Sequence, residues 1–151
     1  MKINEIDFKE VLKKEALNIG LELTNEQLQK FQKYKELLLE WNEKMNLTAI
    51  TDDYGVIMKH FIDCLEVVKY IDDGSNIIDI GTGAGFPGIV ISIYFENKIR
   101  ITLLDSLNKR LIFLNEVRNK LNLVNVEIIH SRAEDYIQKD NIRSGYDVVV
   151  S

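Results

Sequence analysis

The chain has 151 residues, 46% hydrophobic and 28% charged, which is typical of a soluble globular protein long enough to bury a core. Its net charge of −5 argues against a protein that coats naked nucleic acid through charge alone. The sequence contains no run of about 18 apolar residues, the length that a membrane-spanning helix requires. One cysteine and two histidines 70 positions apart exclude an internal disulfide, argue against a metal site, and indicate a cytoplasmic protein.

The first seventy residues carry helical patterns. Apolar residues at 3–4 spacing from Phe8 to Leu17 predict a helix over 7–18, which ends at Gly20. Thr24 and Gln27 predict a capping box at the start of a second helix over 24–44. After a polar interruption over 46–48, a third helix is predicted over 55–71. We therefore expect an N-terminal helical segment over 1–72.

The remaining chain alternates strands with helices. Strands are predicted over 76–80, 100–105, 126–130 and 146–150, and helices over 87–95, 109–121 and 133–138. This alternation predicts an α/β domain with a parallel, doubly wound sheet. The domain begins at 73, within a polar turn, and runs to 151. Because the last strand would leave an apolar edge uncovered, we expect the domain to be incomplete, truncated after its fourth strand.

Four glycines follow the first predicted strand. Gly83, Gly85 and Gly88 fit the dinucleotide pattern GxGxxG, and Asp105 lies where a ribose ligand is expected. Gly81 extends the pattern to DxGxGxG, which begins at Asp79. A carboxylate there repels a diphosphate and suits an ammonium group, so the pattern favours S-adenosylmethionine over NAD. A turn without a ligand is the alternative.

Three acidic residues lie where the second and third predicted strands end. Asp105 can accept hydrogen bonds from both ribose hydroxyls, although it could also cap the following helix. Glu134 and Asp135, after the third strand, lie where an adenine ring is expected. Acidic residues are also common at helix starts, so this second assignment keeps a structural alternative.

Six segments in family order resemble the RsmG (GidB) family of bacterial small-subunit ribosomal RNA methyltransferases: WNEKMNLTAIT, HFIDCL, DIGTGAGFPGIVISI, LLDSLNKRLIFL, SRAED and DVVVS. The resemblance implies a Rossmann-like, class I methyltransferase fold. It also implies transfer of a methyl group from S-adenosylmethionine to N7 of a specific guanosine in 16S ribosomal RNA. The cofactor residues that it carries over are Gly81, Phe86, Asp105, Ser106, Ala133 and Glu134. The family's arginine after the strand-four serine would follow Ser151.

Guanine N7 has a free lone pair, so its methylation requires no general base, and alignment alone can supply catalysis. Cys64 lies mid-helix among apolar residues, which indicates a buried thiol and not a nucleophile. His60 and Asp63 are candidate pocket residues that shape the site or hold RNA, with an ordinary helix as the alternative. We expect 16S ribosomal RNA as the partner, either naked or in the small subunit, and a monomer.

Basic residues gather on the predicted helix over 109–121. Lys109, Arg110, Arg118 and Lys120 give either an RNA-contacting face or a solvated one, and only the first two begin near the predicted site. Two other function classes stay open: an NAD-dependent oxidoreductase, and a folded fragment that binds neither cofactor nor RNA.

Overall fold

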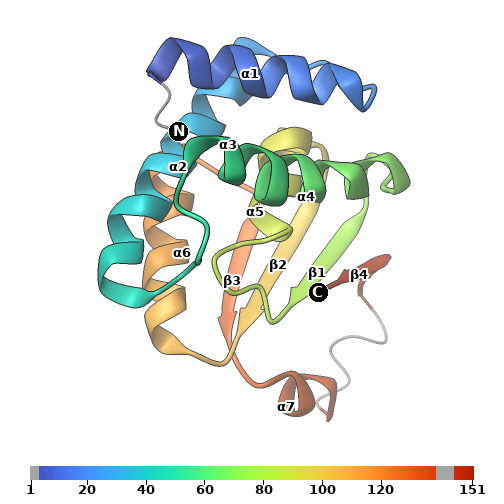
Figure 1. Cartoon of the computed structure of the whole chain (residues 1–151). Helices are drawn as coiled ribbons and strands as arrows, with labels where there is room; N and C mark the ends of the chain where they lie inside the picture. Colours follow the sequence, from blue (N-terminus) through green and yellow to red (C-terminus); the bar gives the residue numbers. More distant parts are fainter. Residues whose placement is uncertain (1–3, 139–144) are drawn as a thin grey trace.

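A computed structural model describes residues 4–138 and 145–151. Its N-terminal part is helical, as predicted: α1 (Glu5–Asn18), α2 (Asn25–Met45) and a continuous helical run over 53–70 (Figure 1). Thr24 and Gln27 form the predicted capping box at the start of α2, with hydrogen bonds of 3.1 and 2.8 Å between side chains and backbone amides. Asn46 ends α2 in the left-handed conformation.

The third helical run differs from the prediction in its interior. It comprises α3 (Asp53–Gly55), a π-helical segment η1 (Val56–Ile62), α4 (Asp63–Leu65) and a 3-10 turn η2 (Glu66–Tyr70). It starts two residues before the predicted 55 because the Asp52 carboxylate accepts a hydrogen bond from the Gly55 amide at 2.8 Å. The π segment widens the helix where the ring of His60 stacks on that of Phe86, in the loop over 81–88.

Four parallel strands form the sheet: β1 (Asn76–Ile80), β2 (Arg100–Asp105), β3 (Val126–His130) and β4 (Val148–Val150). Their order is β3-β2-β1-β4, so the winding direction reverses between β1 and β4. The predicted parallel, doubly wound sheet is confirmed, and ligands bind such sheets at the carboxyl ends of the strands beside the reversal.

The fourth strand is shorter than predicted over 146–150. The side chain of Asp147 accepts the amide hydrogen of Asn76 at 2.8 Å, while the Asp147 amide donates to the Asn76 carbonyl at 2.7 Å. Tyr146 is turned away to Thr102, whose hydroxyl oxygen lies 3.1 Å from the tyrosine hydroxyl. The regular ladder therefore begins only at Val148.

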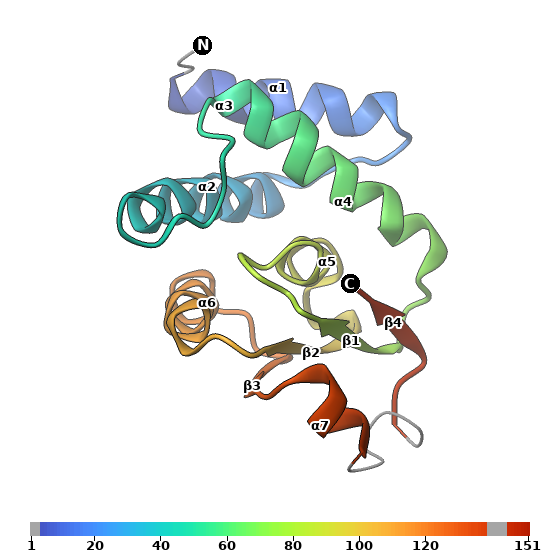
Figure 2. The ribbon, with the colours of Figure 1, turned by 60° about the horizontal axis from the view of Figure 1, so that its bottom comes forward.

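Helices cover the sheet unequally. α5 (Gly88–Phe95) and α6 (Asn108–Leu121) lie on one face, and the short α7 (Ala133–Gln138) lies on the other (Figure 2). A 3-10 turn η3 (Glu96–Lys98) links α5 to β2. α5 is apolar all round and almost wholly buried, because the sheet packs on one side of it and the N-terminal helices on the other.

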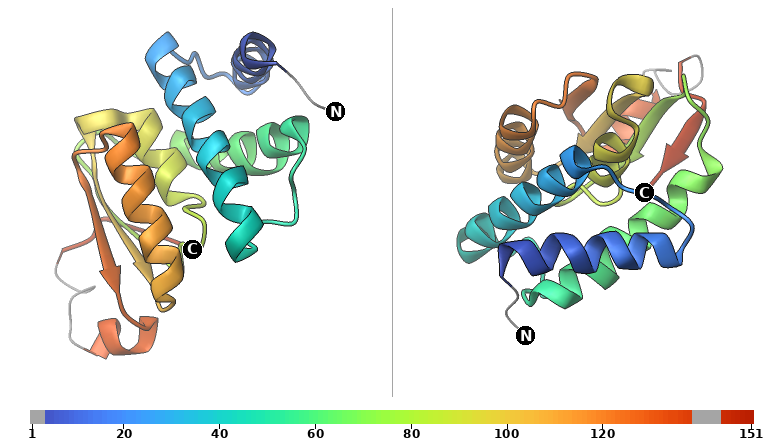
Figure 3. Two further views of the ribbon diagram at one scale, coloured as in Figure 1. Left: turned by 90° about the vertical axis from the view of Figure 1, so that its left-hand side faces the viewer. Right: turned by 90° about the horizontal axis from the view of Figure 1, so that it is seen from above.

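One hydrophobic core joins the two predicted parts of the chain. Tyr34 of α2 and Phe61 of η1 are fully buried in it, together with Ile89 and Ile91 of α5 and Phe113 of α6. The N-terminal helices thus lie directly across the sheet domain (Figure 3). Among the described residues, no helix is both long and apolar enough to cross a membrane.

Candidate functional site

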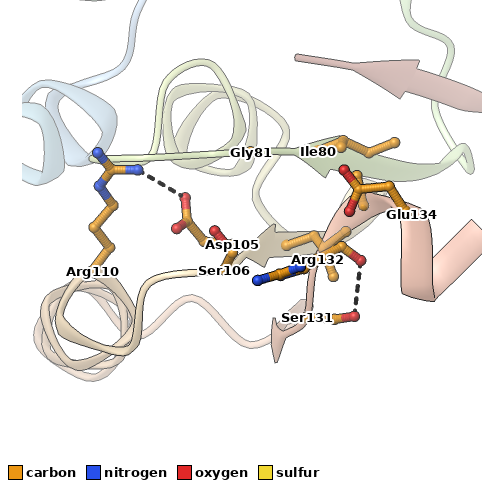
Figure 4. A pocket seen from close by; sticks show the side chains of 10 residues that line it. Ile80, Gly81, Asp105, Ser106, Arg110, Ser131, Arg132 and Glu134 are labelled. Atoms are coloured by element: carbon orange, nitrogen blue, oxygen red, sulfur yellow. Dashed lines mark hydrogen bonds and ion pairs between the residues drawn. The ribbon is translucent and has the colours of Figure 1, made fainter.

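A cavity of about 350 Å³ opens at the carboxyl ends of β1, β2 and β3 (Figure 4). Of the nine predicted cofactor residues, five line it: Gly81, Asp105, Ser106, Ala133 and Glu134. The remaining lining residues are Ile80, Leu104, Arg110, Ser131 and Arg132. The cavity therefore brings together three segments that are far apart in sequence: 80–81, 104–110 and 131–134. Asp79, Gly83, Gly85 and Phe86 lie outside this lining.

The loop over 81–88, here called the glycine loop, is held against the end of β2. The amides of Gly81 and Thr82 donate to the Leu104 carbonyl at 2.9 and 3.0 Å. Gly81, Gly83 and Gly85 have φ values of 70°, 60° and 99°, which side chains rarely adopt. The glycines thus let the backbone turn sharply beside the cavity.

Gly85 lies where the loop meets the N-terminal helices. A Cβ atom there would stand 2.5 Å from Cγ1 of Ile89 and 2.8 Å from the Tyr34 hydroxyl oxygen. The same hydroxyl donates to the Ala84 carbonyl at 2.5 Å, and Tyr34 is completely buried. A core tyrosine of α2 therefore fixes the backbone of the loop.

Asp105 is the best-anchored carboxylate of the cavity and is only 2% exposed. Its Oδ2 accepts the Gly83 amide hydrogen at 2.8 Å, and its Oδ1 accepts that of Leu107 at 2.9 Å. Arg110 lies 3.6 Å from Oδ2 (Figure 4). The N-cap of α6 is Leu107, so Asp105 holds the turn before the helix and does not cap the helix itself. Carboxylate oxygens each accept more than one bond, which leaves acceptor capacity for a ligand.

The third segment, 131–134, continues from β3 into α7. The Ser131 amide donates to the Asp105 carbonyl at 3.0 Å, and a ring nitrogen of His130 lies 2.9 Å from the Ser106 carbonyl oxygen. These contacts join the ends of β2 and β3 and place Glu134 at the cavity. Our sequence reasoning missed Arg132, although its position directly after a strand that reaches the site was a usable signal.

Asp79 is fully buried beneath the glycine loop. Its Oδ2 accepts hydrogen bonds from the Thr82 hydroxyl at 2.7 Å and the Gly88 amide at 2.8 Å, whereas its Oδ1 has no hydrogen-bond partner in the described structure. Burial raises the pKa of Asp79 to about 6, against the lowering effect of both hydrogen bonds. Asp79 thus shapes the loop from within. Its attraction for a ligand ammonium stays a prediction.

The buried Asp79 predicts a pH-dependent stability. The pKa of Asp79 in the folded protein is about 6, against an ordinary value of 3.8. Its contribution to the free energy of unfolding is therefore fully present below about pH 4 and is lost as the pH rises through 6. The loss corresponds to about 3 kcal/mol. Urea denaturation from pH 4 to 7 should show this decline in the wild type and a much smaller one in Asp79→Asn, while Asp73→Asn, in an exposed turn, should behave like the wild type. Equal declines in all three would contradict the assignment.

Of the two candidate pocket residues, His60 lies beside the glycine loop, and neither His60 nor Asp63 lines the cavity. The His60 ring stacks on Phe86, with centroids 4.3 Å apart and an interplanar angle of 8°. Asp63 is exposed. Cys64 is buried, as predicted, and burial raises the pKa of its thiol to about 12. In the described ranges, no group of three His, Cys, Asp or Glu residues could hold a metal ion.

The basic residues of α6 separate into two groups. Arg110 lines the cavity, and Lys109 precedes it on the same helix turn. Arg118 lies at the other end of α6, where it donates to the Val126 carbonyl and to the side chain of Asn115. Lys120 pairs with Glu116 at 3.8 Å. Only the first group is therefore available to a substrate at the cavity.

Comparison with known proteins gives consistent matches. Residues 27–151 match the family model described as rRNA small subunit methyltransferase G. The chain is 52% identical over 144 residues to the ribosomal RNA small subunit methyltransferase G of Clostridium perfringens (strain SM101 / Type A), covering 94% of this chain and 60% of that protein. It is 48% identical over 151 residues to the protein of the same name from Lysinibacillus sphaericus (strain C3-41), covering 99% and 61%. The chain thus spans about three-fifths of the length of these relatives.

Solved structures resemble the fold. A protein-L-isoaspartate O-methyltransferase matches with a TM-score of 0.56 and 16% identity, covering 97% of this chain and 47% of that one. A coclaurine N-methyltransferase bound to N-methylheliamine and SAH matches with a TM-score of 0.52 and 18% identity, covering 97% and 51%. At these identities the likeness concerns the fold alone. It agrees with the predicted Rossmann-like class I fold.

Proposed function

Since the chain belongs to the rRNA small subunit methyltransferase G family, we propose that the protein transfers a methyl group from S-adenosylmethionine to N7 of a specific guanosine in 16S ribosomal RNA. The observation that carries the proposal is the convergence of three segments on one cavity: the glycine loop, the Asp105–Ser106 turn and the Ala133–Glu134 turn. The protein acts in the cytoplasm as a monomer in this proposal.

The residues present fit S-adenosylmethionine. Asp105 offers acceptor oxygens for the two ribose hydroxyls, and Glu134 with the backbone at Ala133 suits the amino edge of adenine. Asp79 is fully buried beneath the glycine loop and outside the cavity lining, so its carboxylate would attract a ligand ammonium through charge and not by direct contact. A ligand with hydroxyls, an amino group and no phosphate matches this set of acceptors.

The proposed methyl transfer requires little from the chain beyond binding and orienting the two reactants. When bound, S-adenosylmethionine supplies an electrophilic methyl group. The acceptor N7 already holds a free lone pair, so no residue has to remove a proton from it. The chain fixes the glycine loop through Tyr34, and it holds Asp105 through the amides of Gly83 and Leu107. Such prior ordering of the site is the contribution expected for a reaction that depends on alignment.

RNA binding has to act against the net charge of −5, so it requires a local basic patch. Arg110 and Arg132 line the cavity, and the exposed Lys109 directly precedes Arg110 on α6. These three cations are suited to RNA phosphates at the mouth of the site. A folded RNA, alone or in the small ribosomal subunit, presents its phosphates to such a patch.

The proposal predicts a ligand preference. Calorimetric titration should show binding of S-adenosylmethionine and S-adenosylhomocysteine, with NAD and NADP at least about tenfold weaker. NAD and NADP are the most informative competing ligands, because Arg110 and Arg132 line the cavity and could contact their phosphates. The activity itself is tested by mapping N7-methylguanosine in 16S ribosomal RNA from cells with and without the gene. Preference for NAD, or an unchanged methylation map, would refute the proposal.

A further inference from the structure

His60, in the π-helical segment η1, packs its ring against the glycine loop. The rings of His60 and Phe86 are nearly parallel at 8°, with centroids 4.3 Å apart. The backbone of Phe86 belongs to the loop turn, since its amide donates to the Thr82 carbonyl at 3.2 Å, as does that of Gly85 at 2.9 Å. Whatever fixes the His60 ring therefore also restrains this turn.

Thr48, in the segment between α2 and α3, contacts the edge of the His60 ring. Its hydroxyl oxygen lies 2.8 Å from Nε2 of His60 and accepts the Ile50 amide hydrogen at 3.0 Å. The hydroxyl hydrogen then has two acceptors within reach: Nε2 at 2.8 Å and the Ile50 carbonyl at 3.4 Å. The shorter distance favours donation to Nε2, which requires a neutral ring with its proton on Nδ1.

The surroundings of His60 agree with a neutral ring. Burial lowers the pKa of His60, and the opposing influence of Asp63 is the smaller one. Thr48 is itself tied to α2, because its amide donates to Oδ1 of Asn42 at 2.8 Å. A continuous chain of contacts thus runs from the end of α2 through Thr48 and His60 to Phe86.

We propose that His60 is a positioning residue: held by Thr48, its ring keeps Phe86, and with it the 82–86 turn, in the conformation in which the Gly83 amide holds Asp105 at the cofactor cavity. The inference rests on the proposed function. It differs from the role of Tyr34, which is buried in the core and supports the whole fold. His60 is only half-buried, so its removal should disturb the loop more than the global stability.

The test compares four variants with the wild type. His60→Ala and Thr48→Val should each weaken S-adenosylhomocysteine binding about fivefold, the effect of losing one ordinary contact. Thr48→Ser keeps the hydroxyl and should restore wild-type affinity. Lys59→Ala, an exposed neighbour on η1, is the matched control and should also bind normally. Combining Thr48→Val with His60→Ala should add nothing to the effect of His60→Ala alone.

Amide hydrogen exchange on the ligand-free variants separates positioning from general destabilisation. In His60→Ala and Thr48→Val, exchange should accelerate at Gly85 and Phe86 and stay unchanged in β1 and β2. Wild-type affinity in both variants, or acceleration spread over the whole molecule, would overturn the inference. If the wild type binds no S-adenosylhomocysteine, the proposed function fails, and the exchange data alone still decide whether His60 restrains the loop.

Discussion

Gly85→Ala is expected to lower the free energy of unfolding by about 3 kcal/mol or more. Two effects add. The φ of 99° is unfavourable for alanine, and the new methyl group would stand 2.5 Å from Cγ1 of Ile89 and 2.8 Å from the Tyr34 hydroxyl oxygen. Both neighbours are fully buried, so neither side chain can withdraw without moving the core. Urea denaturation followed by circular dichroism measures the loss.

Gly74→Ala isolates the conformational part of this cost. Gly74 has a φ of 86°, close to that of Gly85, and no atom lies within 4 Å of the position of its added Cβ. We expect this variant to lose about 1 kcal/mol, from backbone strain alone. If both variants lose the same amount, the close packing of the glycine loop against α2 and α5 does not contribute to stability as described.

Asp105→Asn is expected to weaken S-adenosylhomocysteine binding about a hundredfold. The substitution removes the charge that would strengthen two hydrogen bonds from the ribose hydroxyls, each of which contributes about 1.5–3 kcal/mol to binding. It also places an amide nitrogen against one of the two backbone amides of Gly83 and Leu107. Isothermal titration gives the affinities, and thermal melts report whether the fold is retained.

A cofactor analogue without ribose hydroxyls distinguishes lost ligand contact from a disturbed loop. If Asp105 binds the hydroxyls, the dideoxy analogue binds the wild type weakly, and Asp105→Asn weakens it little further. Glu127→Gln is the control, because this exposed carboxylate lies on β3 outside the cavity lining. An equal loss of affinity for both ligands would show that Asp105 acts only through the glycine loop.

The sequence predicted the sheet well because its signals are local. β1, β2 and β3 have the predicted bounds, since each apolar run ends at a polar residue or a glycine that also ends the strand. Thr24 and Gln27 likewise specify the start of α2 within four residues. For β4 the predicted strand is too long at its start. The hydrogen bond from the Asn76 amide to the Asp147 side chain, which competes with the regular ladder, joins residues 71 positions apart and leaves no local signal.

The parts of the site that depend on tertiary packing could not be predicted locally. The π segment around His60 has the same apolar spacing as an α-helix, so the sequence does not distinguish them. Asp79 is the more instructive case. Strand alternation places it on the same face as Ile77, toward α5, where Gly88 leaves room for its carboxylate. The alternation of the strand is therefore a local signal for a buried group beneath the loop.

The double burial of α5 also constrains the order in which this protein can fold during synthesis. Residues 1–72 leave the ribosome first, yet α2 and α4 pack against α5, which follows them in the chain. Until the glycine loop and α5 are made, Tyr34 and Phe61 have each other as neighbours but lack Phe86, on which both rings pack. The N-terminal helices therefore complete their packing only after the sheet domain has been synthesised. The glycine loop, which lies between these two parts, takes its final shape only when both parts are present.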